Sequence, residues 1–90
     1  MKIVLEADIN KNQAVEKILK SDEIISRQSI ITRIYDNKCY FLIDGSEEAI
    51  KKAKEITKDI AKICEKQEEI IKRIEEEEND AMYGFGNIFG

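Results

Sequence analysis

The chain has 90 residues and a mass of 10.4 kDa, the size of one small domain, which excludes a second hydrophobic core. Hydrophobic residues make up 42% of it and charged residues 38%, with no Pro, Trp or His. The lack of His removes the commonest general base and the favourite zinc ligand, which disfavours most enzyme classes. So short a chain leaves much apolar surface near solvent, and we therefore expect a partner subunit.

The formal net charge of −4 is unevenly distributed along the chain. Residues 75 to 90 hold five of the 19 acidic residues and none of the 15 basic ones, which leaves the preceding part with a net charge of +1. Acidic blocks of this kind are typically solvated and often act as interaction segments. Apolar runs fall short of the ~18 residues of a membrane span, and the first residues do not resemble a signal peptide. We expect a cytoplasmic protein with no membrane segment.

The first half of the chain predicts a strand, a helix and a hairpin. Residues 1 to 8 alternate between apolar and polar side chains, the period of a strand with one face on a core. A helix follows and ends near Ser21. Residues 29 to 35 and 39 to 43 are rich in β-branched and aromatic types, and the Asp36-Asn37 pair between them tolerates the left-handed backbone of a tight turn.

The last predicted helix begins after Ser46, a favourable N-cap residue, and carries a heptad-like seam. Its seam residues follow one another at alternating steps of 4 and 3: Ala49, Ala53, Ile56, Ile60, Ile63, Gln67, Ile70 and Ile74. A helix of about 30 residues spans ~45 Å, more than a three-stranded sheet can cover, so its second half needs a partner helix. The predicted interface comprises Ile56, Ile60, Ile63, Gln67, Ile70 and Ile74. The alternative is a helix that breaks near Gln67 and folds back.

Together these elements predict an α+β fold in the order β-α-β-β-α, with a three-stranded antiparallel sheet and helices on one face. Residues 1 to 78 form the predicted domain, which includes the long C-terminal helix, and residues 79 to 90 form a short flexible tail. A four-stranded ferredoxin-like sheet would need one more strand, and no later segment resembles one. We expect a homodimer through the sheet edge or the helices, with Arg27, Arg33 and Lys38 guarding an exposed hairpin edge.

The hairpin sequence SRQSIITRIYDNKCYFLIDGSEEAIKKA and the order of elements around it, over residues 1 to 63, resemble the small dimer-forming subunit of the KEOPS complex, the Pcc family. The matching features are the basic, serine-containing entry to the second strand and the Asp44-Gly45-Ser46 opening of the last helix. The resemblance implies a non-catalytic homodimer that brings together copies of the catalytic subunit making threonylcarbamoyladenosine, with tRNA contacted only indirectly. The last helix departs from the family pattern, with Glu48-Ala49-Ile50 where a Leu-Arg pair is common.

The terminal sequence EEEENDAMYGFGNIFG resembles the end of archaeal and eukaryotic ribosomal stalk proteins, where an acidic run precedes a short peptide of glycines and aromatic residues. The glycines are expected to prevent a stable helix. The resemblance implies an adaptor whose tail captures a translational GTPase or a related factor. The expected anchors are Met82, Tyr83, Phe85, Ile88 and Phe89. The alternative is a tail that folds back on its own domain.

The remaining residues favour binding over catalysis. Cys39 and Cys64 have no His to activate them and are best read as reduced, buried hydrophobes. We therefore predict no enzymatic activity and no metal or organic cofactor. A candidate RNA-contacting set combines two arginines with four lysines at helical spacing: Arg27, Arg33, Lys51, Lys54, Lys58 and Lys62. The nearly neutral charge of the domain favours the alternative, an ordinary solvated face whose lysines pair with nearby glutamates.

Overall fold

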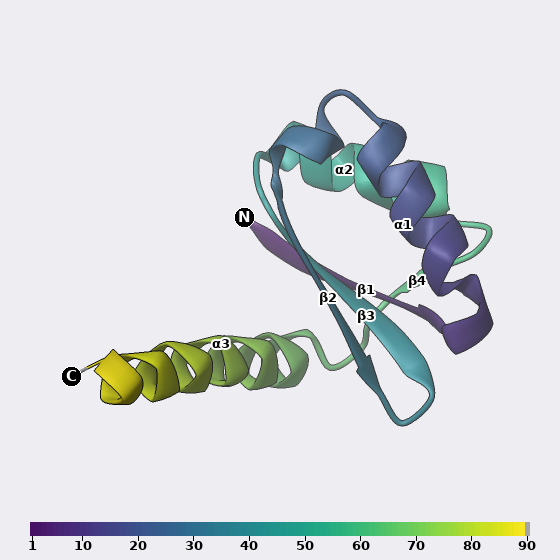
Figure 1. Cartoon of the computed structure of the whole chain (residues 1–90). Coiled ribbons are helices and arrows are strands. Elements are labelled where there is room, and N and C mark those ends of the chain that lie inside the picture. The colour runs from purple at the N-terminus through teal and green to yellow at the C-terminus, as the bar shows by residue number, and fades with distance from the viewer. Residues whose placement is uncertain (90) are drawn as a thin grey trace.

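The computed structural model describes the backbone of residues 1 to 89 and the side chains of residues 1 to 79. Its strands are β1 (Lys2–Asp8), β2 (Ser29–Tyr35), β3 (Lys38–Asp44) and β4 (Lys62–Ile63) (Figure 1). Its helices are α1 (Asn12–Ser21), α2 (Glu47–Thr57) and α3 (Gln67–Phe89), with 3-10 turns η1 at Ile9–Lys11 and η2 at Ile25–Arg27. The predicted α+β class is confirmed. None of the described helices is long and apolar enough to cross a membrane.

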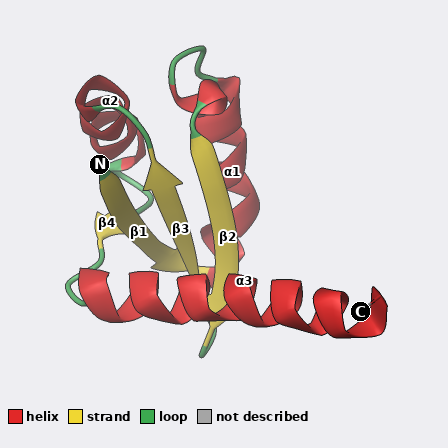
Figure 2. Ribbon diagram, turned by 90° about the vertical axis from the view of Figure 1, so that its left-hand side faces the viewer, coloured by secondary structure: helices red, strands yellow, loops and turns green. Residues whose placement is uncertain are grey.

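The strands form one antiparallel sheet in the order β2-β3-β1-β4 (Figure 2). β1 pairs with β3 along its whole length, from Lys2 opposite Asp44 to Asp8 opposite Lys38, and β2 pairs equally fully with β3. Apart from the 3-10 turns, the chain runs β1-α1-β2-β3-α2-β4 before it enters α3. This order of elements, together with the order of the strands in the sheet, is the ferredoxin-like arrangement. The prediction of a three-stranded sheet is therefore wrong by one strand.

The predicted hairpin is confirmed at its turn. Asp36 and Asn37 both have positive φ angles, 52° and 65°, as a two-residue turn between right-twisted strands requires. The predicted start of the last helix is also confirmed, because the Ser46 hydroxyl accepts a hydrogen bond from the Ala49 amide at 3.1 Å. The register of β2 and the position of α2 are thus fixed by residues that the sequence marks clearly.

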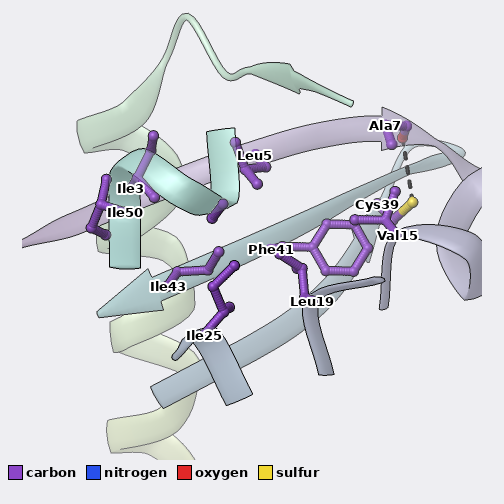
Figure 3. Close-up of a cluster of buried hydrophobic side chains, with 11 residues drawn as sticks. Ile3, Leu5, Ala7, Val15, Leu19, Ile25, Cys39, Phe41, Ile43 and Ile50 are labelled. Carbon is purple, nitrogen blue, oxygen red and sulfur yellow. Dashed lines mark hydrogen bonds between the residues drawn. The ribbon is translucent and has the colours of Figure 1, made fainter. Parts of the chain in front are cut away.

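One hydrophobic core lies between the sheet and the pair α1 and α2. The alternating residues of β1 enter it as predicted, and Phe41 at its centre is completely buried (Figure 3). Its members are Ile3, Leu5, Ala7, Val15, Leu19, Ile25, Cys39, Phe41, Ile43, Ile50 and Ala53. This face of the sheet is therefore the one that the sequence pattern describes best.

A second core lies on the opposite face of the sheet, where α3 packs across the strands (Figures 1 and 2). Val4 of β1 and Leu42 of β3 meet Ile70 and Ile74 of α3 there, beside Cys64. The prediction that all helices lie on one face is therefore wrong. The residues of β1 and β3 alternate strictly between the two faces, so both of their faces are buried against helices.

The predicted last helix is not continuous, because the chain leaves the helix at Thr57 and the C-terminal helix, α3, begins only at Gln67. The amides of Ile60 and Ala61 both donate to the Thr57 carbonyl, at 3.0 and 2.8 Å, and form a tight turn. The chain then enters β4, and the Cys64 amide donates to the Val4 carbonyl at 3.0 Å. The backbone of β1 needs hydrogen-bond partners on this side, and supplying them outweighs the local preference of residues 58 to 66 for helix.

The helix α3 extends from Gln67 to Phe89, so its backbone includes residues 79 to 89, for which the sequence predicts a non-helical tail. Glycine in a helix interior costs only about 1 kcal/mol, so Gly84 and Gly86 disfavour this conformation without forbidding it. The side chains of the predicted tail anchors lie outside the described residues. Their role in binding a partner stays a prediction.

Candidate interaction surface

The strand β2 ends the sheet on one side, and no other strand of the described chain lies beside its outer side. Its sequence, SIITRIY, contains β-branched and aromatic residues with a single charge, that of Arg33. Ile34 remains 49% exposed. A strand of seven residues with this composition and no Pro or Gly is a template for pairing with another chain.

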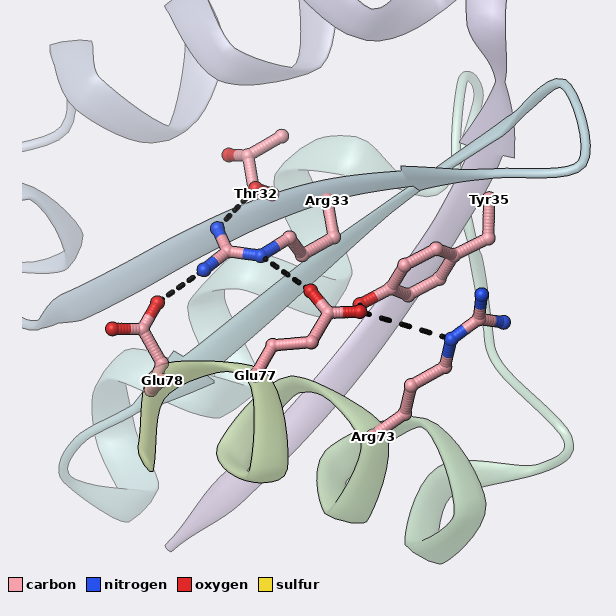
Figure 4. Close-up of polar contacts among 6 residues, drawn as sticks. All are labelled: Thr32, Arg33, Tyr35, Arg73, Glu77 and Glu78. Carbon is pink, nitrogen blue, oxygen red and sulfur yellow. Dashed lines mark hydrogen bonds and ion pairs between the residues drawn. The ribbon is translucent and has the colours of Figure 1, made fainter. Parts of the chain in front are cut away.

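Three residues of β2, namely Ile30, Thr32 and Ile34, present their backbone N–H and C=O groups on the outer side of the strand. We call these backbone groups the β2 edge. In a two-residue hairpin turn the flanking residues, here Tyr35 and Lys38, form a hydrogen-bonded pair, and such pairs alternate with non-bonded ones along the ladder. The residues between them therefore point outward. One contact supports the outward direction of the Thr32 carbonyl. This carbonyl accepts a hydrogen bond from Arg33 Nη1 at 3.0 Å instead of one from β3 (Figure 4).

Arg33 is anchored to α3 by acidic side chains (Figure 4). Its Nε donates to a Glu77 carboxylate oxygen at 3.2 Å, and its Nη2 donates to Glu78. The sequence predicts that Arg33 guards the hairpin edge, and in the structure it covers one outward carbonyl there. Two carboxylates compensate its charge, however, so it repels an incoming strand less than a free arginine would.

Tyr35 belongs to the same contact between β2 and α3 (Figure 4). Its hydroxyl donates to Glu77 at 2.8 Å, and the Arg73 guanidinium lies over its ring at 3.7 Å from the centroid. Burial, together with the hydrogen bond to Glu77, raises the pKa of Tyr35 to about 12, so the hydroxyl remains a donor at neutral pH. This cluster holds α3 against the sheet next to the β2 edge, and α3 continues beyond β2 (Figure 2).

The opposite side of the sheet is closed by the chain itself. β4 pairs with Leu5 and Glu6 of β1. Beyond β4, the Gln67 side chain takes the place of a strand: its Oε1 accepts from the Val4 amide and its Nε2 donates to the Val4 carbonyl, both at 2.7 Å. The outer side of β1 is therefore covered by a two-residue strand and a side chain, whereas β2 is a seven-residue edge strand whose outer side is open in the described chain.

The residues of the predicted helical interface do not form one seam. Ile56 and Ile60 pack against the first core, and Ile70 and Ile74 belong to the second. Gln67 begins α3 and binds β1, as described above. Ile63, on β4, is 50% exposed. Five of the six predicted interface residues therefore make contacts within one chain: Ile56, Ile60, Gln67, Ile70 and Ile74.

The candidate RNA-contacting residues are distributed over four elements and the turn after α2. The set comprises Arg27 in η2, Arg33 in β2, Lys51 and Lys54 in α2, Lys58 after α2 and Lys62 in β4. Although α2 ends at Thr57, Lys54, Lys58 and Lys62 line one hollow. Three of the four lysines thus lie close together, and their role in binding RNA stays a prediction.

A hollow of about 380 Å³ lies beside β4 and carries charges of both signs. Its charged residues are Glu6, Asp8, Lys38, Lys58, Asp59 and Lys62. Glu6, whose side chain is only 12% exposed, forms ion pairs with Lys38 and Lys62, each at 3.3 Å. Burial pushes the pKa of Glu6 upward, but hydrogen bonds from the two lysines outweigh it and lower the pKa below its ordinary value. Acids balance lysines here, so the hollow offers no net charge to a charged ligand.

The two cysteines are placed as small core residues. Cys39 is completely buried and Cys64 is 3% exposed, and burial raises the pKa of both thiols. A thiol becomes nucleophilic by losing its proton, which these surroundings oppose. Among the described residues, no group of His, Cys, Asp and Glu side chains is arranged to hold a metal ion.

Two features of this surface are not predicted from the sequence. The β2 edge depends on the strand order, although the uncharged run SIIT in the sequence is a signal for it. The role of Gln67 has no sequence signal, because it depends on the turn before α3.

Comparisons with protein-family models, curated proteins and solved structures find no match to this chain.

Proposed function

We propose that the protein is a non-catalytic accessory subunit that assembles with another protein chain by strand addition at the β2 edge. The observation that carries this proposal is the contrast between the two sides of the sheet. The chain closes the β1 side with β4 and the Gln67 side chain, whereas the outward groups of Ile30, Thr32 and Ile34 include only one carbonyl with a described partner. Unpaired edge groups of this kind supply the main-chain hydrogen bonds of strand addition.

The chemistry of the side chains supports a binding role. Both thiols are buried with raised pKa values, and the Glu6 carboxylate is engaged by two lysines. The resemblance of residues 1 to 63 to the small KEOPS subunit supports the same class of function and suggests a partner, the catalytic subunit of a complex that modifies tRNA. The fourth strand and the separate α3 lie outside the pattern on which that resemblance is based.

The proposal is tested with Thr32→Pro in an affinity-tagged full-length chain. Proline removes the Thr32 N–H, which points away from β3, so the internal ladder is kept while strand addition is blocked. Thr32→Val is the matched control because it keeps the N–H group. Proteins isolated from the native cell should accompany the wild type and Thr32→Val, and should be lost with Thr32→Pro.

Folding of the variants is checked by circular dichroism and urea unfolding before the isolation. KEOPS subunits among the lost proteins would support the partner that the resemblance implies. If Thr32→Pro is folded and retains every partner of the wild type, association does not use the β2 edge and the proposal fails.

A further inference from the structure

We infer that α3 is a strap held by ion pairs, which detaches from the sheet and uncovers the second core while the first core stays folded. This inference goes beyond the proposed function, because it concerns a face of the sheet instead of its edge and needs no other chain. The buried residues of the second core are Val4, Leu42, Cys64, Ile70 and Ile74. Detachment of α3 would expose the first three of them to solvent.

The apolar part of the contact between α3 and the sheet is small. α3 contributes two buried residues, Ile70 and Ile74, to the second core, whereas the first core has eleven buried members. Beyond these isoleucines α3 continues past β2, away from the sheet (Figure 2). Regions with few buried apolar contacts open at a lower free energy than the rest of a protein, so α3 can open separately.

The sequence sets α3 apart from the rest of the chain by its charge. Residues 67 to 90 contain seven acidic and two basic residues, a net charge of −5, whereas residues 1 to 66 contain 12 acidic and 13 basic residues, a net charge of +1. The acidic helix thus lies on a nearly neutral domain. Its electrostatic attraction to the sheet therefore depends on individual ion pairs and not on the overall charge.

Ion pairs fasten α3 to the two strands that flank β3. On β1, Lys2 pairs with Glu75, and on β2, Arg33 pairs with Glu77 and Glu78 (Figure 4). The three glutamate side chains are 42–47% exposed. Ions in the solvent therefore reach these pairs and screen them, and the attachment of α3 becomes sensitive to salt.

The two cysteines report the opening of the two cores separately. Cys39 belongs to the first core and Cys64 to the second, and both thiols are free and buried. Alkylation of the full-length chain by iodoacetamide, which is uncharged, can be followed at each cysteine by peptide mass spectrometry. At about 0.05 M NaCl we expect Cys64 to react at least about tenfold faster than Cys39. At about 0.5 M NaCl the Cys64 rate should rise about fivefold, and the Cys39 rate by less than about twofold.

Two substitutions on α3 separate the ion pairs from the net charge of the helix. Glu77→Gln removes the carboxylate that Arg33 contacts at 3.2 Å and keeps the size of the side chain. It should raise the Cys64 rate about fivefold at low salt and weaken the response to added salt. Glu76→Gln removes the same charge from an exposed position that makes no ion pair among the described residues. This control should stay within about twofold of the wild type.

Three results would overturn the inference. Equal rates at Cys39 and Cys64 would show that the chain opens only as a whole. A Cys64 rate that does not respond to salt would show that ion pairs do not hold α3, as would equal effects of Glu76→Gln and Glu77→Gln. A variant that accelerates Cys39 as much as Cys64 is globally destabilised, and this too would count against a separate strap. None of these measurements involves another chain, so the proposed function stands or fails independently of them.

Discussion

Glu6 is held nearly buried by the opposite charges of Lys38 and Lys62. Its ionised form is favoured in the folded protein, since its pKa lies below the ordinary value of 4.5. The stabilisation from this carboxylate is therefore fully present above that value and is lost as the pH falls through the folded-state pKa. A single acid thus links the stability of the β1–β4 side to pH.

Replacing this acid with Glu6→Gln should lower the free energy of unfolding by about 1 kcal/mol at pH 7, because two ion pairs are removed while the size of the side chain is kept. The difference from the wild type should shrink as the pH falls below 4.5 and through the lowered folded-state pKa of Glu6, because the wild-type carboxylate then becomes neutral as well. Urea unfolding at pH 7 and at a series of lower pH values measures it. Glu55→Gln, at an exposed position of α2, should show no comparable pH-dependent difference.

Gln67 acts through its amide, which replaces a strand beside Val4. Gln67→Ala should lower the free energy of unfolding by about 1–3 kcal/mol, because the Val4 amide loses its acceptor in a place that water reaches poorly. Gln13→Ala, at an exposed position of α1, provides the control and should change stability by less than about 0.5 kcal/mol. Equal effects of the two substitutions in urea unfolding would show that the strand-like bonds contribute little.

At the scale of elements, the sequence predicts β1, α1, the hairpin and the start of α2, because each is marked by local signals such as the Asp36-Asn37 turn and the Ser46 cap. It does not predict the end of α2. The isoleucines after Thr57 keep helical spacing, and the segment that leaves the helix contains no Pro or Gly. β4 forms because β1 offers it a partner, and that partner is more than fifty residues away in sequence.

The break in the helix gives Ile63 and Ile74 opposite surroundings. Ile74 on α3 is completely buried against the sheet, whereas Ile63 on β4 is 50% exposed. Ile74→Ala should therefore lower the free energy of unfolding by about 2–4 kcal/mol through the cavity that it leaves, and Ile63→Ala by less than about 1 kcal/mol. Thermal or urea unfolding of both variants measures this. Similar losses at the two positions would favour a continuous helical seam.

At the scale of the whole molecule, the candidate site follows from strand order, which single-sequence patterns specify poorly. The run of residues 29 to 35 indicates a strand, but nothing in it says that the strand lies at an edge. Placing β4 beside β1 leaves β2 with an open side, and placing α3 on the second face brings Glu77 and Glu78 to Arg33. The expectation of a partner subunit follows from composition, whereas its location follows only from the topology.

Pairing of a second copy at the β2 edge would make thermal stability depend on protein concentration, because unfolding would then separate two chains and mass action would oppose it. A tenfold increase in concentration corresponds to about 0.7 kcal/mol per chain, which should raise the melting temperature of a domain of this size by roughly 3–5 °C. Thr32→Pro should melt at one temperature across the same range of concentrations, and Thr32→Val should follow the wild type. Calorimetry over two decades of concentration measures the dependence. A wild-type melting temperature that does not change with concentration would show that the folded chain needs no second copy, and the open edge of β2 would then have to be stable in water by itself.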